Sequence, residues 1–224
     1  MMPRLVVFDV DGTLVDSQAD IVASMTAAFL GVALPVPERA AVLRMVGLSL
    51  DHGVRQIAPG LADGVYDRLV SGYKAEYQRL RLLGGAGGTP LYPGMMELLD
   101  GLCGRDDLLL GIATGKSRRG LLALLEMHGL DRHFVTLQMA DDHPGKPHPS
   151  MLLSAMAETG VTAAKTVMIG DTTYDRDMAQ AAGAGFIGVG WGYHAPEEIS
   201  PQRPAVTDAA ALRRAIDDVF EVKT

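Results

Sequence analysis

The sequence has a single cysteine, Cys103, among its 224 residues. One cysteine forms no disulfide within the chain, so no disulfide framework can stabilise the fold. Cys103 lies in a stretch of helical composition at residues 95–103, and we expect its side chain to pack inside the protein rather than to act in catalysis. A free thiol fits a reducing compartment, and the sequence therefore predicts a cytoplasmic protein.

Long apolar runs are also absent. No window reaches the roughly 18 to 20 consecutive apolar residues that a membrane-spanning helix needs. The first apolar run, residues 5–8, stops at Asp9, and no segment has the pattern of a signal peptide. We therefore expect no membrane partner.

The sequence has fewer basic than acidic residues. Lys and Arg number 20 against 27 Asp and Glu, which gives a formal net charge of -7. This balance argues against nucleic acid as a partner, because such proteins carry a basic stripe for the phosphate backbone. A small anionic substrate is compatible with it, since one buried lysine and a divalent cation can make a positive pocket in an acidic protein. Both a monomer and a homodimer stay open.

The composition is that of a folded globular protein, with 48% hydrophobic and 21% charged residues. Short runs rich in Val, Ile and Leu alternate with amphipathic segments of helical length, which predicts an α/β fold with a parallel sheet between two helical layers. The predicted strands are residues 5–8, 108–113, 134–137, 166–169 and 186–189. The predicted helices between them are residues 94–102, 117–128, 149–158 and 174–182.

About a hundred residues separate the first two predicted strands, far more than one crossover helix requires. Helix-compatible segments fill this gap at residues 20–30, 38–45, 50–57 and 62–83. The sequence thus predicts a catalytic core from residues 1–15 and 90–224, and an all-helical cap from residues 16–89 with a hinge at each end. The return segment, 84–90, holds four glycines in five residues, and we expect it to be a flexible connection that lets the cap open and close.

Two acidic residues, Asp9 and Asp11, follow the first predicted strand. Ligands of open parallel sheets bind at the carboxyl ends of the strands, where these acids would lie. The i, i+2 spacing sends both carboxylates to one side of an extended backbone, and Gly12 permits a sharp exit from the strand. A turn or helix cap would use the same residues, so the pair alone does not define a site.

Thr114 and Lys146 follow the next two predicted strands. Thr114 precedes Gly115, whose backbone amide is accessible, although for Thr114 taken alone a cap of the helix that begins near Ser117 is the preferred interpretation. A lysine in a loop is usually solvated, but the prolines that follow Lys146 restrict its direction. It could present its charge to a phosphate.

Asp171 directly follows the fourth predicted strand, at the same sheet edge as Asp9, and Asp175 lies four residues further on. Asp175 has a plausible structural role, because an acid near a helix N-terminus interacts favourably with the helix dipole. Asp171 precedes the helix, so that explanation does not account for it.

Together these residues resemble the haloacid dehalogenase-like superfamily. The resemblance is carried by four motifs in the order of that family: Asp9-Val10-Asp11-Gly12-Thr13, Thr114, Lys146, and Gly170-Asp171 followed by Asp175. It covers nearly the whole chain, because the helical insert matches the family's cap. It implies a Rossmann-like core with the first strand at its centre.

The resemblance also implies a mechanism. Asp9 would be the nucleophile and Asp11 would protonate the leaving oxygen and then activate water. Mg²⁺ would be held by the Asp9 carboxylate, the Asp11 main-chain carbonyl and the Asp171 carboxylate, with Asp175 orienting metal-bound water. Catalytic Thr114 and Lys146, with Gly12 and Gly115, would bind the phosphate.

Within the family, the acid at Asp11 favours phosphate chemistry over dehalogenation and over phosphonate cleavage. The residues that β-phosphoglucomutases use for a second phosphate would align with Ile21 and Leu50, which are apolar here. The chain looks most similar to the phosphoglycolate phosphatases, with a small phosphate monoester as substrate. A nucleotidase, a pyrophosphatase, a β-phosphoglucomutase-like phosphotransferase and an inactive phosphate-binding module stay as alternatives.

Overall fold

The computed structural model describes residues 3–201 and 204–221 of the chain. Its centre is a parallel sheet in the order β3-β2-β1-β4-β5. The strands are β1 (Arg4–Phe8), β2 (Leu108–Thr114), β3 (Thr136–Met139), β4 (Thr166–Gly170) and β5 (Gly185–Gly188). The predicted α/β class and the central position of the first strand are confirmed.

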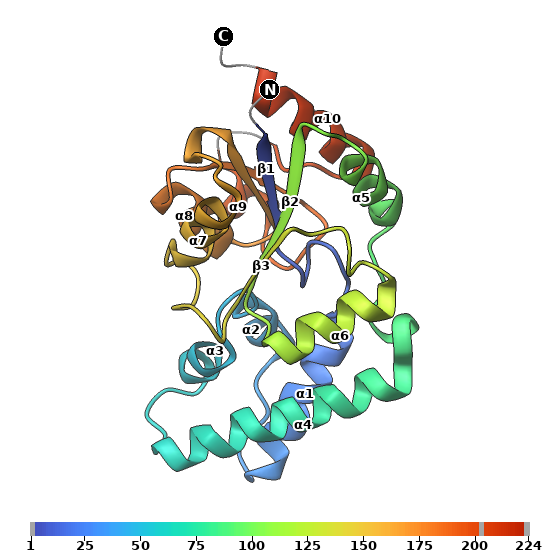
Figure 1. The fold of residues 1–224 in the computed structure, drawn as a ribbon. Coiled ribbons are helices and arrows are strands. Elements are labelled where there is room, and N and C mark those ends of the chain that lie inside the picture. Colours follow the sequence, from blue (N-terminus) through green and yellow to red (C-terminus); the bar gives the residue numbers. More distant parts are fainter. Residues whose placement is uncertain (1–2, 202–203, 222–224) are drawn as a thin grey trace.

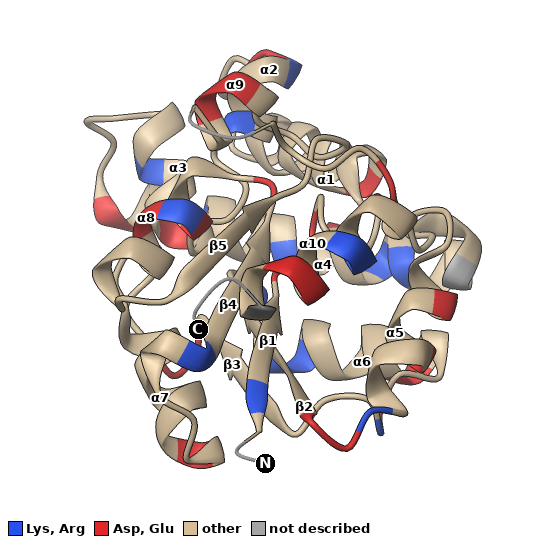
Figure 2. Ribbon diagram, turned by 90° about the horizontal axis from the view of Figure 1, so that it is seen from above, with Lys and Arg blue, Asp and Glu red and all other residues tan. Residues whose placement is uncertain are grey.

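The apolar side chains of β1 alternate between two hydrophobic layers, because successive side chains of a strand point to opposite faces of the sheet. Val6 and Phe8 belong to the layer under α5 (Met95–Cys103), α6 (Arg118–His128) and α10 (Ala209–Glu221). Leu5 and Val7 belong to the layer under α7 (Ser150–Thr159) and α8 (Thr173–Ala181). Figure 2 shows these two groups of helices on opposite sides of the strands.

Two elements near the C-terminus were not predicted from the sequence. They are the short helix α9 (Pro196–Ile199) and the helix α10. A single turn of 3₁₀ helix (Ala163–Lys165) also precedes β4. The strand predicted at residues 134–137 begins two residues later, because Phe134 turns into the core and packs edge-on against Phe8 at a centroid distance of 6.4 Å.

Four helices fill the insert between β1 and α5. They are α1 (Gln18–Gly31), α2 (Arg39–Arg44), α3 (Leu50–Ile57) and α4 (Asp63–Gly88). They lie beyond the carboxyl ends of the strands (Figure 1) and enclose a hydrophobic cluster of their own, which includes Met25, Phe29, Val54 and Leu69. This separate cluster supports our proposal that residues 16–89 form a cap over a core of residues 1–15 and 90–224.

The glycine-rich segment differs from the prediction. Residues 84–88 are the last turns of α4 rather than a loop, with one kink at Gly85, where φ is 53° and ψ is -148°. The helix ends at Thr89, whose hydroxyl donates to Asp20 of α1 at 3.1 Å. Contacts between α4 and α1 thus extend the helix through residues whose own propensity for helix is low.

Cys103 also departs from its prediction, because its side chain is exposed. The buried residues of α5 are Met95, Leu98, Leu99 and Leu102, and these form the stripe that packs on the sheet. Cys103 follows this stripe at the end of the helix. Among the helices in the described part of the chain, none combines the length and apolar character that crossing a membrane requires.

The kink at Gly85 yields a test of the segment. Its φ and ψ lie in a region that only glycine adopts readily, so Gly85→Ala should destabilise the protein by about 1–3 kcal/mol. Gly84 is helical, and a Cβ there would meet no atom within 4 Å, so Gly84→Ala should stabilise the protein by up to about 1 kcal/mol. Urea unfolding of both variants measures the difference. Equal effects of the two substitutions would contradict the kink.

Candidate active site

The carboxyl ends of three neighbouring strands bring the predicted residues together. Phe8 of β1 pairs in register with Ile112 of β2 and with Ile169 of β4. The next residues along these strands therefore emerge at one level of the sheet. Asp9 follows β1, Thr114 ends β2 and Asp171 follows β4, which places all three side chains at the same edge.

Three carboxylates are buried together at this edge. Asp9, Asp171 and Asp175 each offer an oxygen atom, and these oxygens lie within 4.8 Å of one another. Burial disfavours the charged form and like charges repel, so both effects raise the pKa of a carboxyl group here. Burial and the neighbouring acids raise the pKa of Asp171 well above its ordinary value. Burial above all raises the pKa of Asp9 to about 7, while Lys146 opposes this rise.

Lys146 is the counter-charge of the cluster. Its Nζ lies 2.8 Å from Asp9 Oδ1 and 2.6 Å from Asp175 Oδ1, and only 1% of the residue is exposed. Burial by itself would lower the pKa of Lys146, but the carboxylates of Asp175 and Asp9 raise it above its ordinary value. The lysine is therefore charged at neutral pH, and the solvated alternative for this residue does not apply.

The positions of Asp171 and Asp175 are fixed by hydrogen bonds. Asp171 accepts from the Thr13 hydroxyl at 2.9 Å and from the Tyr193 amide at 2.8 Å. Asp175 and Thr172 form a capping box at the start of α8, in which each side chain accepts from the backbone amide of the other. Asp175 thus has the structural role at the helix N-terminus that the sequence suggested. The same side chain also belongs to the carboxylate cluster and contacts Lys146.

Two glycines let the backbone close around Asp171. A Cβ on either Gly12 or Gly192 would collide with its carboxylate, and Gly12 in addition has φ of +83°. The Gly12 amide donates to the Val15 carbonyl at 2.9 Å. The geometry therefore gives Gly12 a structural role, a turn that leaves room for a carboxylate, while its contact with phosphate stays a prediction.

The carboxylate cluster has the character of a cation site. Both Asp9 oxygens are buried without a hydrogen bond, since the contact with Lys146 is an ion pair that does not meet hydrogen-bond geometry. Unpaired buried carboxylate oxygens are costly unless a cation neutralises them. An oxygen-only donor set suits Mg²⁺. The residues present therefore fit the predicted divalent cation.

Asp11 lies beside the cluster, in a different environment. Its carboxylate is 2.8 Å from Lys116 Nζ and accepts a hydrogen bond from the Ser17 hydroxyl. Lys116 in turn donates to the Tyr77 hydroxyl of α4 at 2.9 Å. Burial by itself would lower the pKa of Lys116, but Asp11 and Tyr77 raise it above its ordinary value. The hydrogen bond between Lys116 and Tyr77 connects the sheet edge to the helical insert.

Thr114 is buried at the end of β2 and accepts from the Lys116 amide at 3.2 Å. The N-cap of α6 is Ser117, whose hydroxyl accepts from the Gly120 amide. Thr114 is therefore not the helix cap. A Cβ on Gly115 would lie 2.6 Å from the Leu48 carbonyl, so the absence of a side chain there lets the loop of the insert approach the sheet edge.

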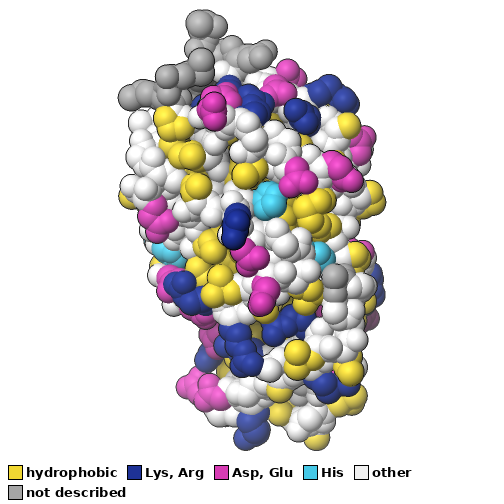
Figure 3. Space-filling model, turned by 45° about the vertical axis from the view of Figure 1, so that its right-hand side comes forward, with side chains coloured by type: hydrophobic (Ala, Val, Ile, Leu, Met, Phe, Trp, Pro, Cys, Tyr) yellow, Lys and Arg dark blue, Asp and Glu magenta, His cyan; other side chains and the backbone are white. Residues whose placement is uncertain are grey.

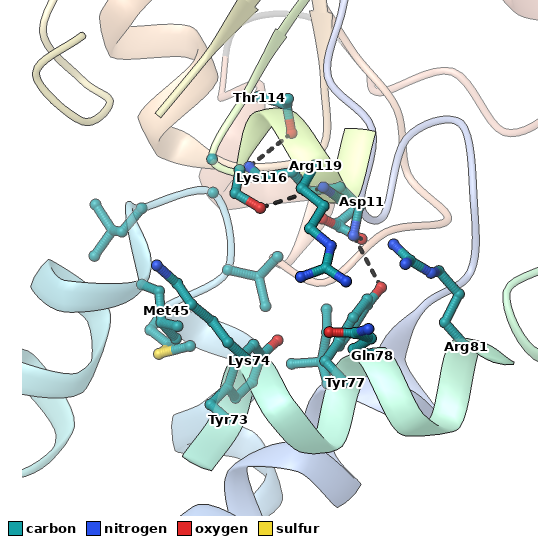
Figure 4. Close-up of a pocket in the computed structure, with 18 of the residues that line it drawn as sticks. Asp11, Met45, Tyr73, Lys74, Tyr77, Gln78, Arg81, Thr114, Lys116 and Arg119 are labelled. Carbon is teal, nitrogen blue, oxygen red and sulfur yellow. Dashed lines mark hydrogen bonds and ion pairs between the residues drawn. The ribbon is translucent and has the colours of Figure 1, made fainter. Parts of the chain in front are cut away.

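A cavity of about 210 Å³ opens above Asp9 and Asp11, between the sheet edge and the insert. Thr114, Gly115 and Lys116 line its core side. Figure 4 shows side chains of α4 projecting into it from below, with the Tyr77 hydroxyl reaching Lys116. His148, two residues after Lys146 in the loop that follows β3, is exposed and does not line this cavity.

Several residues of this site were not predicted from the sequence. Lys116 follows Thr114 by two residues, so its place at a strand end was the one signal that could have identified it. Ser17, Tyr77 and Tyr193 come from a helix start, a cap helix and the loop after β5, and only the fold brings them together. The Tyr193 hydroxyl contacts the Ser17 amide at 3.0 Å, while Trp191 donates to the Thr13 carbonyl at 3.1 Å.

The raised pKa of Asp9 predicts a pH-dependent stability. With chelator present, protonated Asp9 is retained in the folded state up to about pH 7 but is lost in the unfolded state near pH 4. The stability of the wild type should therefore fall as pH rises through this window. Asp9→Asn removes the ionisation and should raise the free energy of unfolding at pH 8 by about 2 kcal/mol, or Tm by about 4–8 °C.

Thermal unfolding at pH 4, 6 and 8 measures this effect. The Asp9→Asn variant should gain little at pH 4, and Mg²⁺ should stabilise the wild type more than the variant. Asp16→Asn is the control, because Asp16 lies outside the cavity. The assignment would be wrong if both variants followed the pH dependence of the wild type.

The chain is similar to known proteins over most of its length. A family model described as haloacid dehalogenase-like hydrolase matches residues 6–189. The chain is 40% identical over 210 residues to a probable phosphatase IndB of Dickeya dadantii, covering 92% of this chain and 89% of that protein. A tyrosine-protein kinase PtkA of Mycobacterium tuberculosis is 31% identical over 98% of this chain and 72% of its own length.

A phosphoglycolate phosphatase of Pseudomonas putida is 32% identical, covering 94% of this chain and 79% of that protein. Among solved structures, a hydrolase from Pseudomonas syringae superposes with a TM-score of 0.83 at 25% identity. This match covers 97% of the present chain and 99% of that one. The likeness thus includes the helical insert as well as the sheet.

Proposed function

The chain belongs to the haloacid dehalogenase-like hydrolase family, and from this premise we propose that it is a magnesium-dependent phosphatase that hydrolyses a small phosphate monoester through a covalent phosphate on Asp9. Relatives named as phosphatases, at 40% and 32% identity, support the enzyme class. The observation that carries the mechanism is the placement of Lys146 between Asp9 and Asp175, beside Asp171 and under a cavity.

Asp9 is proposed as the nucleophile. Its carboxylate lines the cavity, lies at the end of the central strand and is held by no hydrogen bond. An Asp9 oxygen attacks phosphorus in line with the ester oxygen, the new O–P bond forms and the ester P–O bond breaks. The alcohol departs and the phosphoryl group stays on Asp9.

Attack by a carboxylate on a phosphate brings like charges together, so positive charge must surround both. Lys146 supplies one charge at Asp9, and the Thr114 hydroxyl with the Gly115 amide is proposed to bind phosphoryl oxygens. Asp9, Asp171 and the main-chain carbonyl of Asp11, with Asp175 beside them, would hold a divalent cation, which would supply further charge neutralisation. The Asp175 carboxylate also orients Lys146 through its 2.6 Å contact.

Asp11 is proposed as the acid and base. Its carboxylate lines the cavity next to Asp9, where a protonated Asp11 gives its proton to the departing ester oxygen. The resulting carboxylate then takes a proton from the water that attacks phosphorus and releases inorganic phosphate from Asp9. The proton balance closes over the two steps.

Several alternatives belong to the same chemistry. A mutase reaction is disfavoured because Ile21 and Leu50, at the positions expected to bind a second phosphate, line the cavity as apolar side chains. A nucleotidase and a pyrophosphatase stay open, and resemblance favours a phosphoglycolate phosphatase-like substrate. A phosphate-binding module without turnover is disfavoured because Asp9, Asp11 and Lys146, the residues proposed as nucleophile, acid and counter-charge, lie together at one sheet edge. Cytoplasmic location stays a prediction, as does the choice between monomer and homodimer.

Phosphate release tests the proposal. The panel contains 2-phosphoglycolate, sugar phosphates, nucleoside monophosphates and pyrophosphate, each with Mg²⁺ or with chelator. Asp9→Asn should lower turnover of every hydrolysed ester by about 10³-fold or more, because a nucleophile has no substitute in this site. Asp16→Asn should retain wild-type turnover.

Trapping identifies the intermediate directly. Borohydride reduces an aspartyl-phosphate to homoserine, so treatment during turnover should convert Asp9, and no other aspartate, to homoserine in a peptide mass map. Wild-type turnover in Asp9→Asn, or phosphate release unaffected by chelator, would overturn the mechanism. Absence of release from every ester would favour the binding module.

A further inference from the structure

Three basic residues that line the cavity have no role in the proposed mechanism. Lys74 and Arg81 of α4 line one wall, and Arg119 of α6 lines another. In Figure 4, Arg81 and Arg119 extend from these two helices into the space beside Asp11. Figure 3 shows further Lys and Arg side chains over the lower half of the molecule, the region of the insert.

Lys74, Arg81 and Arg119 have no counter-charge among the residues that the structure describes. Within the side chains that the structure describes, Lys74, Arg81 and Arg119 take part in no ion pair. Neighbouring arginines on the same helices differ in this respect. Arg79 pairs with Glu76 at 2.7 Å, and Arg118 pairs with Asp142 at 2.7 Å.

A charge balance shows what these cations are available for. Even if Asp9, Asp11, Asp171 and Asp175 are all ionised, the positive charges of Lys116, Lys146 and the proposed divalent cation balance their four negative charges. Three uncommitted positive charges then face a substrate phosphate that carries two negative charges. The chain as a whole is acidic, with a net charge of -7, so this excess at the cavity is local.

The remaining wall is apolar and aromatic. Tyr73 and Tyr77 stack with ring centroids 5.8 Å apart, and Ile21, Leu48 and Leu50 complete the lining on the side of the insert. Lys74 and Arg81 are seven residues apart on α4, which places them roughly 10 Å apart along the helix axis, with Tyr77 between them and Tyr73 just before Lys74. Because Arg81 lines the cavity, an anion bound by its guanidinium would lie at the cavity wall.

Resting on the proposed function, we infer that Arg81 and Arg119 form a clamp for a second anionic group, so that the substrates are phosphate esters whose leaving group carries a carboxylate or another phosphate. A guanidinium binds such groups through two parallel hydrogen bonds. Arg81 belongs to the insert and Arg119 to the sheet domain, so both reach one anion only when the insert covers the site. Recognition of the second anionic group is then coupled to closure of the insert over the site.

Matched esters test this inference. Hydroxyethyl phosphate is the uncharged counterpart of 2-phosphoglycolate, and glycerol 1-phosphate that of 3-phosphoglycerate. A hexose bisphosphate with its monophosphate forms the second-phosphate arm. The wild type should prefer the member with the extra anion in at least one arm, and the arm identifies whether that anion is carboxylate or phosphate.

The variants are Arg81→Gln and Arg119→Gln, which remove charge at similar length. Each should lower kcat/KM for the preferred anionic ester by about 10- to 100-fold, as expected for the loss of a hydrogen bond between charged groups. Each should change kcat/KM for the uncharged counterpart by less than about 2-fold. Arg81→Lys should recover part of the loss. Arg79→Gln and Arg118→Gln are matched controls that should change neither.

Binding to Asp9→Asn by calorimetry keeps the inference separate from catalysis. There the preferred anionic ester should bind more tightly than its counterpart, and Arg81→Gln should abolish the difference. Hydrolysis without any preference for the extra anion, or equal losses for both esters in the arginine variants, would overturn the clamp while leaving the phosphatase intact. No hydrolysis combined with preferential binding would overturn the phosphatase and support the clamp.

Discussion

The contact between Lys146 and the buried carboxylates is the constraint on which the rest of the site depends. Three acids within one small volume repel one another, and the protein tolerates them because one ammonium group bridges Asp9 and Asp175 at 2.8 and 2.6 Å. The lysine offsets part of the negative charge and leaves both carboxylate oxygens of Asp9 without a hydrogen bond. In the proposed mechanism, this uncompensated negative charge would attract a divalent cation and leave Asp9 available for bond formation.

The parallel sheet makes such a concentration of charge possible. The apolar runs 5–8 of β1 and 167–169 of β4 are fully buried, so their acidic residues come only after the strands end, and the parallel arrangement collects the carboxyl ends on one edge. The hydrophobic layers on either side of β1 hold that edge rigid, while the helical insert covers it. Lys116 and Tyr77 then connect insert and core across the cavity. The hydrophobic layers stabilise the fold, and the candidate active site lies at the edge of the sheet between them.

Sequence reasoning reached the parallel sheet, the helical insert and the approach of Asp9, Asp171 and Lys146, because these follow from apolar runs and from the residues at their ends. It did not predict that α4 continues through residues 84–88, where packing on α1 overrides the low helix propensity of glycine, and the hinge in this segment stays a prediction. It was wrong about Cys103, which lies outside the buried stripe of α5. Tyr77 and Tyr193 could not be predicted, since each contacts residues more than 30 positions away through tertiary structure alone.

The backbones of Gly12 and Gly192 enclose the Asp171 carboxylate, with no room for even one methyl group on either. In terms of mutational tolerance, two residues with no side chain are therefore as constrained as the acid between them. An alanine at either position would displace the carboxylate rather than fill a void, and the loss would appear in metal affinity before it appeared in folding. The positions of this site that cannot be substituted thus include more than the chemically active residues. They extend to the turn after the first strand and the loop after the last.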